Sequence, residues 1–134
     1  DEDSAGGLMN TDILTVRPDV TVEVTLRYLR NQKAIPRDTD SIFVVNRKNE
    51  YRGTLLLSRI LTEDPQTQVS EIMSKKIFPI AVDAPSENVV WEFENRDLVS
   101  APVIDNQNKL LGRILLINSA SLGFVAPTTI PILL

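Results

Sequence analysis

Two ten-residue stretches of the sequence decide the fold: Val44-Val45-Asn46-Arg47-Lys48-Asn49-Glu50-Tyr51-Arg52-Gly53 and Val103-Ile104-Asp105-Asn106-Gln107-Asn108-Lys109-Leu110-Leu111-Gly112. They align without a gap, and apolar residues follow each glycine. A strand that ends in a polar turn and is followed by a second strand predicts a β-hairpin. The glycine at the start of the second strand indicates close backbone approach or a bulge. The chain therefore contains an internal repeat of one structural unit.

A second match lies upstream of each hairpin. Leu8-Met9 corresponds to Ile72-Met73, and each pair leads into a strand-like stretch, at 13–16 and at 77–82. A proline turn then follows in both halves. The matched order of these features extends the repeat well beyond the hairpins.

Helices are predicted after each proline turn. Thr21 and Ser86 are suitable N-caps, because their hydroxyls can accept a hydrogen bond from an unpaired backbone N–H. The apolar spacing predicts helices at about 22–32 and 87–95, and a closing helix at about 57–61.

We therefore expect an α/β fold (α+β) of two βαββα repeats packed as a pseudo-two-fold pair, because a half of this size buries too little apolar surface to be stable alone. A cleft is expected between the halves. The expected organisation is a flexible segment at 1–7, repeat one at 8–61, a linker at 62–71, repeat two at 72–118 and a C-terminal tail at 119–134.

The composition excludes several kinds of chemistry. The chain has no His and no Cys, which excludes Ser–His and Cys–His catalysis and zinc hydrolysis. Any metal must be a hard cation on oxygen ligands, such as Mg²⁺ or Ca²⁺. The net charge of −4 and the absence of a basic stripe argue against nucleic acid. No Walker loop or nucleophile elbow is present, so we expect no enzyme.

The repeated order of apolar–Met pair, strand, proline turn, helix and hairpin resembles the CBS domain, and its duplication over about residues 8–118 resembles a tandem CBS pair (Bateman module). The joint Asp64-Pro65-x-Thr67-x-Val69-Ser70-Glu71-Ile72-Met73 and the opening Leu8-Met9-x-Thr11-Asp12 are similar to the cytosolic CBS region of MgtE-type magnesium transporters. The resemblance implies a regulatory, cytoplasmic domain of an inner or plasma membrane protein. It also implies homodimerisation through CBS pairs and coupling to a transmembrane transporter domain of the same full-length chain.

The same resemblance implies Mg²⁺ sensing that gates transport. Glu87 and Asp97 align with acidic positions that share Mg²⁺ in such transporters, and Asp83 lies near them, whereas Asn118 stands at a position that is usually acidic. The alternative interpretation is structural: Glu87 is then a first-turn helix residue and Asp97 a turn residue.

Many CBS pairs bind ATP or AMP, and the resemblance implies a ribose-binding Asp six residues after each hairpin glycine. Arg59 and Asn118 occupy these positions here, so both ribose carboxylates are missing. Asn118 can still accept one hydrogen bond, and Arg59 can meet a phosphate unless it simply faces solvent. An adenine-nucleotide sensor is therefore the alternative to the Mg²⁺ sensor, and a ligand-free dimerisation module is the third hypothesis.

Overall fold

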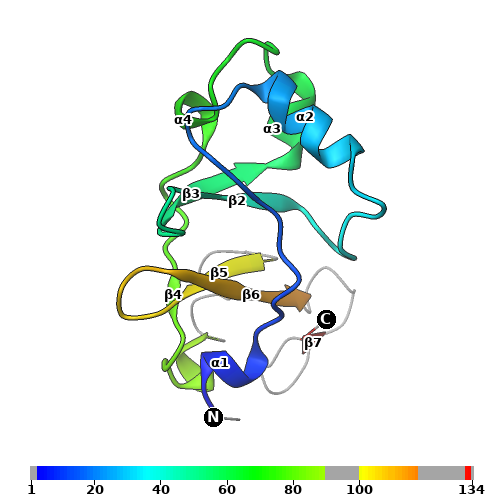
Figure 1. Cartoon of the computed structure of the whole chain (residues 1–134). Coiled ribbons are helices and arrows are strands. Elements are labelled where there is room, and N and C mark those ends of the chain that lie inside the picture. The colour runs from blue at the N-terminus through cyan, green and yellow to red at the C-terminus, as the bar shows by residue number, and fades with distance from the viewer. Residues whose placement is uncertain (1–2, 90–99, 118–131, 134) are drawn as a thin grey trace.

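The computed structural model describes residues 3–89, 100–117 and 132–133. Two small sheets face each other in the middle of the molecule, and helices lie at its two outer ends (Figure 1). The elements in chain order are α1 (Ala5–Leu8), β1 (Thr15–Val16), α2 (Val22–Arg30), β2 (Ser41–Val45), β3 (Tyr51–Leu56), α3 (Leu57–Thr62), α4 (Val69–Ile72), β4 (Ile80–Ala81), β5 (Ser100–Ile104), β6 (Leu110–Ile117) and β7 (Ile132–Leu133).

The two sheets repeat one topology. The first has the order β1-β2-β3 and the second the order β4-β5-β6-β7; in each, the first pair is parallel and the next pair antiparallel. Val44 lies opposite Gly53, and Val103 lies opposite Gly112. Both hairpins shift register directly after that valine. The predicted hairpins and the predicted duplication are thus confirmed.

Local capping explains where α2 begins. Thr21 Oγ1 accepts a hydrogen bond from the Val24 N–H at 3.2 Å, as expected of an N-cap. Val22 and Leu29 are buried against the first sheet, and the helix ends at Arg30, two residues before the predicted end. In the second half residues 86–89 are helical, and the rest of the predicted helix 87–95 lies outside the described residues.

The N-terminal residues require a correction. The sequence predicts a flexible segment at 1–7, but Ser4 and Ala5 are buried, and the Ala5 N–H donates to Ala84 O at 2.8 Å. A Cβ on Gly6 would lie 2.9 Å from Val82 Cγ2. This glycine therefore permits close packing of α1 on the second half, rather than flexibility.

The linker helix α4 packs in the opposite direction, onto the first half. Val69 is fully buried in the first core, and its N–H donates to Val20 O at 2.8 Å. Each of these two short helices therefore lies at the start of one repeat and packs against the other half. A third apolar cluster lies between the two halves and contains Phe43, Val45, Tyr51 and Leu110.

Candidate functional site

An approximate two-fold axis relates the two hairpin turns. The Tyr51 N–H donates to Asn108 O at 3.0 Å, and the Leu110 N–H donates to Asn49 O at 2.9 Å. The side-chain amides repeat the exchange: Asn108 Nδ2 donates to Tyr51 O at 3.1 Å and Asn49 Nδ2 to Leu110 O at 3.0 Å. Both asparagines have φ of 65°, a left-handed conformation that Asn tolerates better than most residues. Positions of the two hairpins that align in the sequence therefore also share the same backbone conformation and the same hydrogen bonds.

The same approximate two-fold axis also relates the starts of β2 and β5. Ser41 and Ser100, which occupy equivalent positions, have their hydroxyl oxygens 3.3 Å apart. The Asp40 carboxylate accepts a hydrogen bond from Ser100 Oγ at 2.6 Å. Polar contacts therefore connect the two halves beside their shared apolar cluster.

Arg113 is a buried cation in the second half. It is 3% exposed, and its guanidinium donates to Arg37 O at 2.9 Å and Asp38 O at 3.3 Å. Burial lowers the pKa of Arg113, and the carboxylates of Asp12 and Asp40 oppose that shift. The side chain therefore ties the loop before β2 to the second sheet.

A hollow of about 250 Å³ lies next to Arg113, with a mixed polar and apolar lining of Asn10, Asp12, Arg37, Asp38 and Leu115. Sequence reasoning missed Arg113 as a residue of the region between the halves. The available signal was a single cation inside the apolar run Leu110-Leu111-Gly112-Arg113-Ile114-Leu115. A charged residue there predicts a polar partner.

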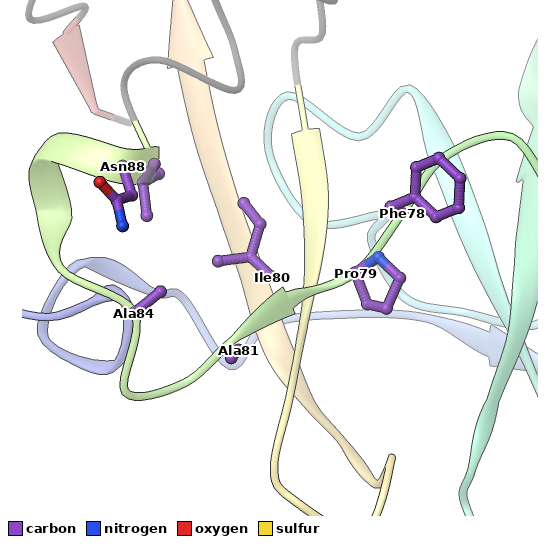
Figure 2. Close-up of a pocket in the computed structure, with 7 residues that line it drawn as sticks. Phe78, Pro79, Ile80, Ala81, Ala84 and Asn88 are labelled. Atoms are coloured by element: carbon purple, nitrogen blue, oxygen red, sulfur yellow. The ribbon is translucent and has the colours of Figure 1, made fainter.

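A second hollow, of about 200 Å³, opens beside β4. Figure 2 shows residues 78–81, which lead into and form β4, on one side and Ala84 and Asn88 on the other. The walls are mainly apolar, and the Asn88 amide adds a donor and an acceptor. Small-molecule pockets typically measure about 300–1,000 Å³. This hollow therefore suits a flat ring or part of a ligand.

Two of the three predicted metal ligands, Asp83 and Glu87, lie at the end of the molecule that carries α1. Asp83 and Glu87 are exposed, on the turn after β4 and in the helical residues 86–89. Asp97 lies outside the described residues. Among the residues that the structure describes, no three His, Cys, Asp or Glu side chains gather closely enough to hold a metal ion.

The predicted nucleotide residues are Arg59 and Asn118. Arg59 lies on α3 and forms an ion pair with Glu63 at 3.1 Å, with half of its side chain exposed. Asn118 lies outside the described residues. Arg59 lines neither of the two hollows described above.

The matched sheets, the reciprocal hairpin turns and the swapped short helices define a pair of like domains. The CBS domain model matches residues 5–65 and 69–116, so the chain belongs to the CBS domain family. Paired CBS domains are non-catalytic regulatory modules. The family resemblance found in the sequence is confirmed.

Curated relatives of the chain are magnesium transporters. The chain is 36% identical over 112 residues to magnesium transporter MgtE of Thermus thermophilus. The matched region covers 84% of this chain and 25% of that protein. It is 24% identical over 112 residues to MgtE of Enterococcus faecalis, with the same coverage of both chains. The chain thus spans about a quarter of the length of these relatives.

Comparison with solved structures also finds parts of magnesium transporters. The cytosolic domain of the Mg²⁺ channel MgtE in complex with ATP matches with a TM-score of 0.81 at 35% identity, over 86% of this chain and 46% of that one. The soluble part of a magnesium transporter also matches with a TM-score of 0.81, over 86% of this chain and 45% of that one, and at 23% identity supports the fold alone. Among the helices of the described residues, none has both the length and the hydropathy needed to cross a bilayer.

Proposed function

We propose that this chain is the regulatory CBS pair of a magnesium transporter, where it senses Mg²⁺ on the cytoplasmic side and gates transport by a membrane domain of the same full-length chain. The observation that carries the proposal is the 36% identity to a magnesium transporter across 112 residues. Homodimerisation through CBS pairs is part of the proposal. The two-fold arrangement within the chain supports a module that changes shape as a unit.

Carboxylates at the α1 end support a cation-sensing role. The Ser86 N–H donates to Asp3 O at 3.0 Å, so Asp3 lies next to the stretch that carries Asp83 and Glu87. Mg²⁺ takes few direct carboxylates and keeps several waters. These exposed groups would therefore hold a hydrated ion shared with a neighbouring segment or protomer, and Asp97 is proposed to join them.

A bound ion would change the equilibrium between compact and loosened states. Carboxylates that lie near one another repel when no cation is present, and Mg²⁺ removes that repulsion. The ion therefore favours the arrangement in which the carboxylates and the neighbouring segment are close. Loss of Mg²⁺ is expected to loosen the α1 end.

Titration with Mg²⁺ tests the proposal. We expect millimolar Mg²⁺ to protect the α1 end from hydrogen exchange, and Asp83→Asn/Glu87→Gln to abolish that protection. Asp19→Asn/Glu23→Gln is the matched control, because it removes the same charge from exposed positions of the first half. If Mg²⁺ has no effect on the unaltered chain, or protects both variants equally, the proposed sensor is wrong.

An adenine nucleotide is the second candidate ligand. The hollow beside β4 supports it, as does the similarity to an MgtE cytosolic domain that was solved in complex with ATP. Calorimetric titration with ATP, ADP and AMP tests this candidate, and Ala84→Leu should weaken binding because it fills the hollow. Nucleotide binding without any Mg²⁺ response would favour the nucleotide sensor, and an unchanged dimer under every ligand would favour a ligand-free dimerisation module.

A further inference from the structure

Half of the cations of this acidic chain gather on one edge of the molecule. Both hairpin turns lie on the same side, the left side in Figure 1. Arg17 donates a hydrogen bond to Asn46 O, and Lys109 Nζ donates to Lys48 O at 2.6 Å. These contacts bring cations of three separate segments together. We define the hairpin edge by seven of the 14 Lys and Arg residues: Arg17, Arg47, Lys48, Arg52, Lys75, Lys76 and Lys109.

The backbone contacts of β3 place Lys75 and Lys76 on this edge. Ser74 and Thr54 exchange backbone hydrogen bonds at 2.7 and 2.9 Å, and the Tyr51 hydroxyl donates to Ile77 O at 3.0 Å. Residues 74–77 therefore run beside β3 from Thr54 toward the turn. Both lysines are exposed.

Few carboxylates lie among these cations. The Asp105 carboxylate accepts a hydrogen bond within its own turn, from the Gln107 N–H at 2.8 Å. Glu50 forms an ion pair with Arg52 at 3.7 Å. The hydrogen bond from Asn46 lowers the pKa of Glu50, slight desolvation opposes the shift, and the nearby Arg52, Lys109 and Lys48 lower the pKa further.

The remaining cations of the edge are not neutralised within the described structure. Of its seven cations, Arg52 alone forms an ion pair with a described carboxylate. Among the residues that the structure describes, the rest of the molecule holds six Lys and Arg residues and 11 of the 13 Asp and Glu residues. The surface is therefore strongly asymmetric in charge, although the net charge is −4.

We propose that the hairpin edge docks on an anionic lipid bilayer surface. The edge consists of turns and extended backbone that carry long side chains, so it suits a diffuse sheet of charge rather than one bound molecule. Anionic lipid headgroups attract clustered Lys and Arg in this way. At physiological ionic strength, salt screens the interaction of exposed charges over about 8 Å. Acidic groups that lie farther than this from the edge therefore weaken its attraction to anionic lipid only slightly.

This inference rests on the proposed function, because a cytosolic domain joined to a membrane domain stays close to a bilayer. Docking would fix the orientation of the domain relative to the bilayer. The hairpin turns and the α1 end are separate parts of the molecule in Figure 1. The two activities can therefore be tested independently.

Co-sedimentation with vesicles tests the docking. We expect the chain to bind vesicles of equal parts phosphatidylcholine and phosphatidylglycerol, not pure phosphatidylcholine, and to be released at about 0.5 M salt. Each basic residue contributes about fivefold to such partitioning, so Arg47→Gln/Lys48→Gln should weaken it about 25-fold. Arg30→Gln/Lys33→Gln is the matched control, since both residues are exposed near the end of α2 and the net charge changes equally.

Equal losses in the two double variants would overturn the proposal, as would equal binding to both kinds of vesicle. Binding to soluble polyglutamate without binding to vesicles would also overturn it and would identify an acidic protein segment as the partner. Circular dichroism checks that both variants fold. The Mg²⁺ titration is repeated on Arg47→Gln/Lys48→Gln: a retained Mg²⁺ response together with lost lipid binding separates the docking from the proposed sensor.

Discussion

Asn49 and Asn108 each perform two tasks, since each adopts a left-handed backbone conformation and donates its amide to the opposite hairpin. Replacement of Asn108 by Ala removes the hydrogen bond and imposes a conformation that costs an L-residue about 1–2 kcal/mol. Asn108→Gly also removes the hydrogen bond, but glycine adopts the left-handed conformation without steric cost and loses only some additional chain entropy on folding. We expect a loss of about 2 kcal/mol for Ala and about 1 kcal/mol for Gly, measured by urea unfolding. Equal losses would show that the backbone conformation is unimportant.

Glu50 makes the hairpin edge sensitive to acid. The folded state lowers its pKa below the ordinary 4.5, mainly through the Asn46 amide and the nearby cations. Its stabilising effect is therefore present above pH 4.5 and is lost as the pH falls through the lowered folded value. In Glu50→Gln this contribution to the pH dependence should be absent. Urea midpoints of both proteins across this pH range provide the measurement, and parallel pH profiles would contradict the expectation.

At the scale of elements, the first residues of each repeat are held by close approach to a strand of the other half. A Cβ on Gly112 would lie 2.6 Å from Asn10 O, and a Cβ on Gly53 would lie 3.0 Å from Ser74 O. Gly112→Ala should therefore cost about 1–3 kcal/mol, and Gly53→Ala less, because overpacking forces the backbone apart. Thermal unfolding of the two variants checks the order. A smaller loss for Gly112→Ala would contradict the swapped packing.

An element can be predicted from the sequence when the residues that cause it lie close together in the chain. The hairpins and the start of α2 depend on turn asparagines and a capping threonine, which a sequence displays directly. The packing of α1 depends on Gly6 meeting Val82, and the anchoring of the loop before β2 depends on Arg113 reaching the carbonyl groups of residues 37 and 38. Such contacts join positions that are distant in sequence. One sequence shows the polar or small residue but not its partner.

The same distinction applies to the candidate site. The family resemblance predicts Glu87 as a metal ligand, and Asp83 is predicted from its place near Glu87; exposure of these carboxylates alone does not make a metal site. A hydrated ion shared with another segment leaves little trace in a single chain, because few of its ligands are direct. The hollow beside β4 combines backbone and side chains of several segments, so its shape depends on the tertiary fold rather than on a motif.

At the scale of the whole molecule, the swapped segments and the cluster around Phe43 predict that the two halves unfold together. Ile60 is buried in the core of the first half, whereas Trp91, the single tryptophan, belongs to the second half of the sequence. Ile60→Val should lower stability by about 0.5–1.5 kcal/mol. If the halves are coupled, Trp91 fluorescence and far-ultraviolet circular dichroism should shift to the same lower urea midpoint. A fluorescence midpoint that stays unchanged while the dichroism midpoint falls would show that the halves unfold independently, and a change of state at the α1 end would then not reach the first half.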